Sequence, residues 1–276
     1  MATHKIVGRQ PEINALKQTL TLRRHLVIEG PVGVGKTFLV TEALKSLGLN
    51  YQRVDGDTRY TEQKLTGWFD PPTVLKKGYT KDAFIEGPLV LAMKKGEVLF
   101  INELNRMPES VQNILLPAMD EGRIMIPKWG EVVAKSGFTV VATQNPKEFT
   151  ATHALSEALL DRFEMLTLSY QTREEEINIA TSSRKKKANQ ATIELVVDLV
   201  RSTRQHPAIK RGASIRAALS ILDLIESGMP LKEACLMALP TRIEMLSADE
   251  DPRQVIENLL DGPTLPQLEK KKSQRR

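Results

Sequence analysis

The residues best suited to chemistry lie in the stretch GPVGVGKT, which fits the pattern G-x-x-x-x-G-K-[ST]. Its glycines let the backbone curl so that N–H groups can face phosphate oxygens. Lys36 would reach the β- and γ-phosphates of a nucleotide, and the Thr37 hydroxyl would ligate Mg²⁺. The predicted phosphate loop is Gly30, Pro31, Val32, Gly33, Val34, Gly35, Lys36 and Thr37. We therefore expect ATP and Mg²⁺ as cofactors.

A polar pair, Asn102-Glu103, follows the apolar run VLFI, which reads as a buried parallel strand. Ligands sit at the carboxyl ends of such strands, so the pair would lie beside the phosphates. Glu103 is then placed to orient or deprotonate an attacking water. The alternative is a strand-end turn before a helix, because Pro108 and Ser110 signal a helix start just beyond.

Asn102 stands where a nucleotide-hydrolysing protein would be expected to carry Asp. An Asn side chain keeps a carbonyl oxygen that can accept a hydrogen bond from a magnesium-bound water, but it lacks the negative charge. Two interpretations follow: a slow hydrolase with a raised magnesium requirement, or a switch that binds ATP without hydrolysing it. We expect the slow hydrolase, because Glu103 and Lys36 are present.

Two further polar residues follow at strand and helix ends. The run FTVVATQN ends in Asn145, which could hold the attacking water or the γ-phosphate. In EALLDRFEM, Arg162 could be an ordinary cation at a helix end, or an arginine finger that stabilises charge on a transferring phosphoryl group. Spacing alone does not decide between these two roles.

The elements that must position these residues form an alternating pattern. Strands are expected at 25–30, 51–56, 97–103, 138–145 and 164–170, with helical stretches between them, as in a parallel α/β sheet. The stretch 67–88 is rich in Gly, Pro and aromatic residues and is expected to be an exposed loop. Two alternating runs predict a hairpin at 123–133, which could be an ordinary edge hairpin.

After Tyr170 the pattern becomes helical, with apolar residues such as Ile193 and Val197 on one helix face. We therefore expect an α/β domain over 1–170, a small all-helical lid over 171–260 and a basic tail over 261–276.

Composition bounds the remaining possibilities. The 41% hydrophobic content suits a globular protein, and no apolar run is long enough to span a membrane. The sequence has one cysteine, Cys235, so no internal disulfide can form. Cys235 lies on an apolar stretch, and we expect it in the core. Because no signal-peptide pattern is present, we expect the protein in the cytoplasm. The charge of +5 gathers at Arg184–Lys187 and in the tail, where it could touch nucleic acid or be solvated surface. The four histidines lack metal-ligand spacing.

The motifs together resemble those of the AAA+ ATPases, and within them the MoxR family. The stretches that carry the resemblance are IVGRQPEI, GPVGVGKT, LTGWFDPP, VLFINELNRMP, VVATQNP, EALLDRF and GASIRAALSIL, in the family's order. The resemblance implies a five-stranded sheet of order 5-1-4-3-2. It also implies that the 67–88 loop faces a central pore, and that the 123–133 hairpin is the helix-2 insert, which couples nucleotide state to a partner.

The same resemblance implies roles for individual residues. Val7 and Gly8 would lie near the adenine, and Asn102 with Glu103 would form the Walker B site, in which Asn102 departs from the family's Asp. Asn145 would be sensor 1, and Arg162 a finger acting on a neighbouring subunit. Arg216 would be sensor 2, reaching the γ-phosphate from the lid. Asp55 is a weaker match to a polar position that restrains the catalytic glutamate.

The resemblance further implies a ring of identical subunits, a hexamer, and a protein substrate. Family members commonly act on proteins with a von Willebrand A domain. A nucleic-acid motor or loader is the alternative, resting on the basic clusters.

Overall fold

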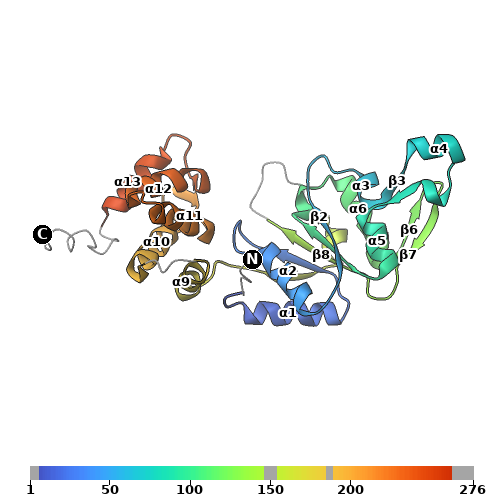
Figure 1. Ribbon diagram of the computed structural model, residues 1–276, viewed down its shortest axis with the longest axis horizontal. Coiled ribbons are helices and arrows are strands. Elements are labelled where there is room, and N and C mark those ends of the chain that lie inside the picture. The colour runs from blue at the N-terminus through green and yellow to red at the C-terminus, as the bar shows by residue number, and fades with distance from the viewer. Residues whose placement is uncertain (1–5, 146–153, 185–188, 263–276) are drawn as a thin grey trace, which may run out of the picture. The chain divides into compact units, whose positions relative to one another are not determined.

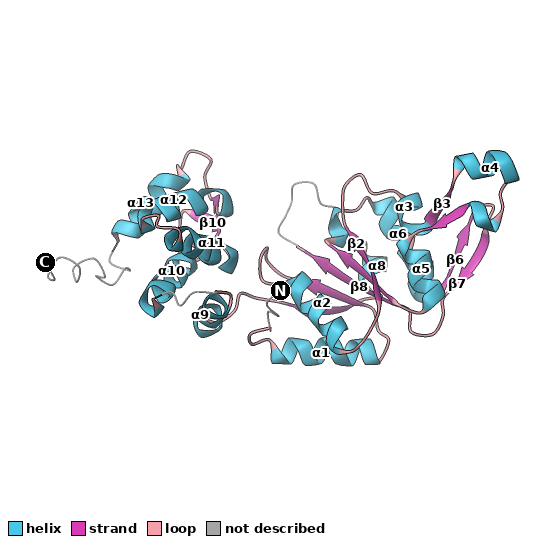
Figure 2. Cartoon of the chain, in the orientation of Figure 1, coloured by secondary structure: helices cyan, strands magenta, loops and turns pink. Residues whose placement is uncertain are grey.

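A computed structural model describes residues 6–145, 154–184 and 189–262 (Figures 1 and 2). Contacts divide the chain into two compact units. The first, which we call the sheet unit, is Arg9–Ser169. The second, the helical unit, combines Met1–Gly8 with Tyr170–Arg276. The expected tail lies outside the described residues from 263 onward, as do Lys185, Lys186 and Lys187.

The sheet unit is built on five parallel strands in the order β2-β5-β8-β1-β9. Numbered along the chain as five strands, this is the expected order 5-1-4-3-2, so the prediction is confirmed. The central strands are buried almost throughout, as parallel sheets require. The bounds are β1 Leu26–Glu29, β2 Tyr51–Asp55, β5 Val98–Asn102, β8 Thr139–Gln144 and β9 Glu164–Thr167.

Helices connect and cover these strands. α5 packs against β2 and β5, and its Leu89 and Met93 are fully buried with Leu99 and Ile101 of β5 in one apolar core. α1 and α2 pack together, and α2 carries the end of the predicted phosphate loop. The helices are α1 Gln10–Thr21, α2 Lys36–Ser46, α3 Glu62–Thr66, α4 Pro71–Lys77, α5 Pro88–Lys95, α6 Glu109–Asn113, α7 Leu115–Asp120 and α8 Glu157–Leu160.

The stretch 67–88 is not the loop that we expected. It contains antiparallel strands β3 (Gly67–Phe69) and β4 (Phe84–Glu86) with α4 between them. Asp70 caps α4 by accepting the Thr73 N–H, and prolines occupy the first helical turn, where their missing N–H is not needed. The segment interrupts the helical stretch after β2, between α3 and α5. The helix-2 insert that the resemblance implies therefore corresponds to β3–α4–β4, and the expectation that it is the hairpin at 123–133 is wrong.

The hairpin at 123–133 is formed by β6 (Arg123–Ile126) and β7 (Gly130–Val133). Its turn packs on the β3–α4–β4 segment: the Trp129 ring lies 5.5 Å from Phe84, and the Lys128 ammonium lies 3.8 Å from the Tyr79 ring centroid. Figure 1 shows both segments at the same end of the sheet unit. Aromatic contacts thus join two insertions that are separate in sequence.

The helical unit contains α9 Arg173–Ser182, α10 Gln190–Ser202, α11 Ile215–Glu226, α12 Leu231–Ala238 and α13 Pro252–Asp261. The face predicted for α10 is buried, including Ile193 and Val197. A two-stranded ribbon, β10 (Ile209–Arg211) with β11 (Glu244–Met245), accompanies the helices, so the unit is helical but not purely so. Cys235 is fully buried in its core, and burial raises the pKa of the thiol to about 12.

Candidate nucleotide and magnesium site

The predicted phosphate loop begins directly after β1 and ends in the first turn of α2. Gly33 and Gly35 have φ values of 80° and 94°, a conformation that glycine adopts without the steric cost of a side chain. The Lys36 ammonium donates to the Gly30 and Pro31 carbonyl oxygens at 2.5 and 2.9 Å. A nucleotide would therefore have to draw this ammonium from the loop's own carbonyls to its phosphates.

Asn102 stands at the centre of a hydrogen-bond network at the end of β5. Its Oδ1 accepts the Thr37 hydroxyl at 2.7 Å and the Thr143 hydroxyl at 3.0 Å. Its Nδ2 donates to Asp55 Oδ1 at 3.0 Å. The structure thus brings together the two residues predicted to serve the metal, Thr37 and Asn102. Asp55 also pairs with Arg53, and that hydrogen bond is the main cause that lowers the pKa of Asp55.

Glu103 follows in a left-handed backbone conformation, with φ 59° and ψ 52°. Such a conformation costs a residue other than glycine on the order of 1 kcal/mol or more, and it clusters at functional sites. Its N–H donates to the Thr143 hydroxyl at 2.9 Å, and its carboxylate pairs with Arg106 at 2.9 Å. Glu103 is therefore held by Arg106, whereas Asp55, the expected restraint, bonds to Asn102.

Close backbone approach at Gly56 supports this arrangement. The Gly56 N–H donates to the Asn102 carbonyl oxygen at 2.7 Å. A Cβ atom at Gly56 would lie 2.1 Å from the Glu103 carbonyl oxygen, so no other residue fits there without a backbone shift. Gly56 thus allows the end of β2 to close against the Asn102-Glu103 pair.

Asn145, expected as sensor 1, lies just after β8 and is 5% exposed. Its carbonyl oxygen accepts the Asn105 Nδ2 at 3.1 Å. The Asn105 Oδ1 is buried without a hydrogen-bond partner among the described residues. Asn105 therefore ties the turn that carries Glu103 to the turn that carries Asn145.

The donor set suits magnesium bound to a nucleotide. Mg²⁺ takes oxygen ligands, keeps several waters and takes the rest from phosphates and a few side chains. Thr37 Oγ1 and Asn102 Oδ1 are two such oxygens, 2.7 Å apart, at the end of the phosphate loop. These residues can hold Mg²⁺, with Asn102 acting through a bound water.

Arg162 lies elsewhere. It forms a short ion pair with Asp120 and donates to the Ala158 carbonyl oxygen. It precedes β9, whose first residue, Glu164, pairs with Leu26 at the start of β1, whereas the phosphate loop follows Glu29 at the far end of that strand. Arg162 and the loop are thus at opposite ends of the sheet.

The remaining predicted residues belong to the helical unit. Arg216 is the second residue of α11; it is exposed and makes no hydrogen bond or ion pair within the described part of the chain. The Val7 carbonyl oxygen accepts the Gln171 side chain at 2.5 Å. Gly8 approaches Glu175 so closely that a Cβ would lie 1.8 Å from its Oε1.

Three residues at or near the site went unrecognised in the sequence. Thr143 could have been found, because it lies two positions before Asn145 and strand alternation places both on one side. Arg106 could have been suspected from its spacing of three from Glu103. Arg9, 8% exposed, donates to the Val34 carbonyl oxygen of the loop at 3.4 Å and to that of Ser169 at 2.5 Å, and only the fold reveals these contacts.

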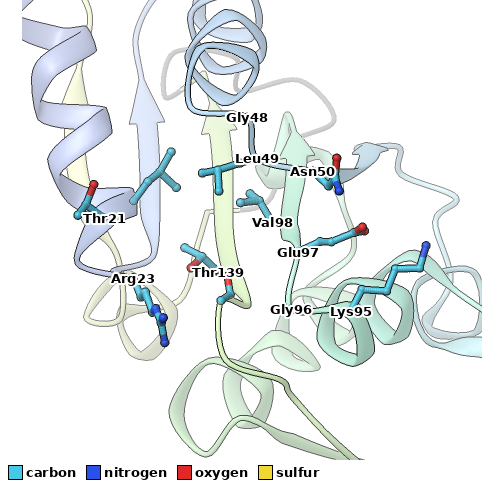
Figure 3. Close-up of a pocket in the computed structure, with 12 residues that line it drawn as sticks. Thr21, Arg23, Gly48, Leu49, Asn50, Lys95, Gly96, Glu97, Val98 and Thr139 are labelled. Carbon is cyan, nitrogen blue, oxygen red and sulfur yellow. Dashed lines mark hydrogen bonds between the residues drawn. The ribbon is translucent and has the colours of Figure 1, made fainter.

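A cavity of about 380 Å³ lies at the amino ends of the sheet strands (Figure 3). It is lined by Asn50, Val98 and Thr139, at the starts of β2, β5 and β8. Arg23, Lys95 and Glu97 also line it. Because the phosphate loop and Asn102 lie at the carboxyl ends of the strands, this cavity is separate from the candidate site.

Comparison with known proteins agrees with this geometry. Residues 25–163 match the AAA domain of the dynein-related subfamily, and residues 171–262 match the CbbQ/NirQ/NorQ C-terminal domain. The uncharacterized protein YeaC of Bacillus subtilis is 27% identical over 248 residues, covering 80% of this chain and 74% of YeaC. An uncharacterized protein of Staphylococcus haemolyticus is 28% identical over 254 residues, covering 90% of this chain and 94% of its own length.

Solved structures share the fold. A candidate ATPase from Cytophaga hutchinsonii matches with a TM-score of 0.52 and 23% identity, over 93% of this chain and 90% of that chain. A RuvB variant of Thermotoga maritima matches with a TM-score of 0.52 and 18% identity, over 92% of this chain and 67% of that chain. With a dynein-related AAA domain followed by a CbbQ/NirQ/NorQ C-terminal domain, the chain belongs to the AAA+ ATPases of MoxR type.

Proposed function

We propose that the protein hydrolyses ATP slowly, with Mg²⁺, as a ring of identical subunits that remodels or matures a protein partner in the cytoplasm. Six subunits are the expected number from the family resemblance. One observation supports the proposal most: Asn102, which Glu103 follows directly, contacts Thr37 of the phosphate loop, while Arg162 lies at the opposite end of the sheet.

The residues of this chain divide the work as follows. Lys36 binds the β- and γ-phosphates after leaving the Gly30 and Pro31 carbonyls. Thr37 and Asn102 would hold the magnesium ion, Asn102 through a bound water, and the ion would neutralise phosphate charge. Glu103 orients the attacking water and accepts its proton, for which its carboxylate must turn away from Arg106. We assign Asn145 to the water or the γ-phosphate and, from the family resemblance alone, Val7 and Gly8 to the adenine and Arg216 to the γ-phosphate.

The position of Arg162 is the reason to expect a ring. Glu164 pairs with Leu26 at the start of β1, and the phosphate loop begins after Glu29 at the end of that strand. The strand rises roughly 10 Å between these two residues, so the loop begins at least that far from Glu164. Arg162 is thus poorly placed for its own nucleotide. We therefore assign it to the nucleotide of a neighbouring subunit, with the Asp120 carboxylate pairing with the guanidinium until that contact forms.

Mixing two inactive variants tests this arrangement. Arg162→Ala retains Glu103, and Glu103→Gln retains Arg162, so each variant supplies what the other lacks. Either variant alone should lose turnover, by roughly 10³-fold where the finger is fully used. An equimolar mixture should regain activity at about a quarter of the interfaces if subunits mix at random. A mixture as inactive as its components would overturn the ring mechanism.

The partner is best sought with the protein held in its ATP-bound state. The family resemblance suggests a protein with a von Willebrand A domain. Support for a docking surface comes from exposed apolar side chains on the insertions, among them Trp68, Leu75 and Met125. Glu103→Gln with ATP should capture the partner, and Lys36→Ala should not. Equal capture by both variants would show that binding is independent of nucleotide.

A nucleic-acid motor is the second candidate, and one observation weakens it. Arg184, the first residue of a basic cluster, has a side chain only 3% exposed and pairs with Asp223 and Glu226. It is therefore not available to a phosphate backbone. Salt-sensitive DNA binding with stimulated ATP turnover would favour this candidate, and an absence of binding near physiological salt would remove it.

A further inference from the structure

An asparagine beside a bound cation is useful in only one orientation. Its amide has a carbonyl end, which attracts Mg²⁺ or accepts from a magnesium-bound water, and an NH₂ end, which repels both. A half-turn of the side chain exchanges the two ends at almost no cost in shape. The Asp found at this position in the family has no such problem, because its two oxygens are equivalent.

Asp55 faces the NH₂ end of this amide. The two residues are register partners on adjacent strands, β2 and β5, so their side chains leave the sheet side by side. Asp55 Oδ1 accepts from Asn102 Nδ2 at 3.0 Å, and a carboxylate can only accept. If the amide turned over, two oxygens would face each other at this distance.

The opposite end is arranged to match. The Thr143 hydroxyl accepts the Glu103 N–H at 2.9 Å, so its own proton is directed to Asn102 Oδ1 at 3.0 Å. The Thr37 hydroxyl reaches the same oxygen at 2.7 Å. Asn102 is thus fixed from both ends, with its carbonyl toward the residue that would ligate magnesium.

Charge is a smaller part of the effect than orientation. Arg53 pairs with the same carboxylate, with distances of 2.8 and 3.2 Å from its Nη2 and Nε, so the Arg53–Asp55 pair is nearly neutral as a whole. The carboxylate oxygen that faces Asn102 still accepts its NH₂ group. Arg53 also holds the carboxylate in place, because the paired contact is directional.

We propose that Asp55 is a positioning residue for the magnesium site: it locks the Asn102 amide with its carbonyl toward Thr37, and so makes asparagine workable where the family carries Asp. The inference rests on the proposed function, because it requires that magnesium nucleotide binds at this site. It predicts that Asp55 matters when residue 102 is Asn and ceases to matter when residue 102 is Asp.

The test measures the affinity for ATPγS by calorimetry, in excess magnesium and in EDTA. The ratio of the two affinities is the magnesium-dependent gain. Asp55→Ala should reduce this gain by about 10-fold or more, the usual size of a change outside the metal's direct ligands, and should leave the affinity in EDTA within about twofold. Asp55 has a side chain 58% exposed, so the substitution should not prevent folding.

Two further variants complete the design. Asp57→Ala is the matched control, because Asp57 is an acid two positions along the chain that pairs with Arg59 and makes no hydrogen bond to Asn102. The magnesium-dependent gain in ATPγS affinity should be the same in Asp57→Ala as in the native protein. Asn102→Asp alone places two carboxylates in contact, which disfavours ionisation of one of them. The double variant Asp55→Ala with Asn102→Asp relieves that repulsion, so its gain should match or exceed the native gain.

The outcomes separate the hypotheses. An equal loss from Asp55→Ala in both backgrounds would show that Asp55 only supports the local fold, and would overturn the inference while leaving ATP binding intact. An equal loss in Asp57→Ala would assign the effect to general charge, with the same consequence. A native chain that binds no ATPγS in either condition would overturn the proposed function and the inference together.

Discussion

Two polar networks, one in each unit, differ in how completely their groups are satisfied. In the helical unit, Glu176 is 2% exposed and both its oxygens are paired, with Arg204 at 2.8 Å and Arg201 at 3.0 Å. In the sheet unit, Asn102 is half-buried and joined to neutral hydroxyls and one half-exposed carboxylate. A buried charge pair resists change, whereas hydroxyl and amide groups can exchange partners with little loss.

This difference indicates that the Glu176 network is structural and that the Asn102 network suits a ligand. Arg204 also donates to the Ala213 carbonyl oxygen and lies 4.0 Å from the Tyr170 ring centroid, so the Glu176 network joins the start of the helical unit to the loop before α11. It has a structural role. The Asn102 network places two oxygens, Thr37 Oγ1 and Asn102 Oδ1, at the end of the predicted phosphate loop, and on the proposed function these hydrogen bonds would exchange for contacts with a magnesium nucleotide.

Breaking the structural network should have the largest effect. Glu176→Ala leaves Arg204 and the partly exposed Arg201 without their carboxylate, which should cost about 3 kcal/mol. The single cysteine, Cys235, is fully buried in the helical unit, so its reaction with a thiol reagent reports opening of that unit. The labelling rate should rise by about 100-fold or more. Both tryptophans, Trp68 and Trp129, lie in the sheet unit, so the denaturation curve followed by their fluorescence should change little.

Glu174→Ala is the control for that experiment, because Glu174 is an exposed acid on the same helix. Its effect should stay within about 0.5 kcal/mol. Similar labelling rates for the two variants would contradict the structural role of Glu176.

Breaking the ligand network should have the next largest effect, and on binding instead of stability. Lys36→Ala removes the charged donor to the β- and γ-phosphates, and ATP affinity should fall by about 100-fold or more. Lys45→Ala, on the same helix but paired with Glu42 at the surface, should bind ATP normally. ATP affinity retained in Lys36→Ala would show that the loop does not bind phosphates.

Removing the centre of the ligand network should cost little stability. Asn102→Ala leaves Thr37 and Asp55 able to reach water but removes the acceptor of the buried Thr143 hydroxyl, so tryptophan-monitored unfolding without nucleotide should shift by about 1–2 kcal/mol. A loss of about 3 kcal/mol or more in the sheet unit, the size expected for the helical unit in Glu176→Ala, would show that the Asn102 network is structural as well, and the comparison would fail.

The smallest expected effect is a change of stability with pH, and it comes from a histidine outside both networks. His25 directly precedes β1; its Nδ1 accepts the Val140 N–H at 2.9 Å, and burial lowers the pKa of His25. A histidine with a lowered folded pKa binds its proton more readily when unfolded, so stability falls as pH drops through about 6.5, the unfolded value. His25→Gln should show a shallower loss of stability between neutral and mildly acid pH, followed by tryptophan fluorescence. An unchanged slope would contradict this assignment.

Much of this could be predicted from the sequence, because its signals are local. The phosphate loop is contiguous, and each strand that carries a site residue is an apolar run ending in a polar group. Three features were missed for different reasons. The β3–α4–β4 segment was read as loop from its prolines, although Asp70-Pro71 is also a helix start. The Asp55–Asn102 contact depends on the register between two strands. The burial of the Arg184 side chain depends on acidic partners far along the chain. Local sequence patterns contain neither kind of information.

The central claim is that a site with Asn102 still hydrolyses ATP, and turnover against a Glu103→Gln control tests it most directly. The comparison is made at high magnesium and high protein concentration, where metal binding and assembly are both complete. The native protein should turn over ATP slowly but clearly above Glu103→Gln, and its activity per subunit should fall when the protein is diluted from this concentration. Native turnover equal to that of Glu103→Gln under these conditions would contradict the claim and would identify the protein as an ATP-dependent switch.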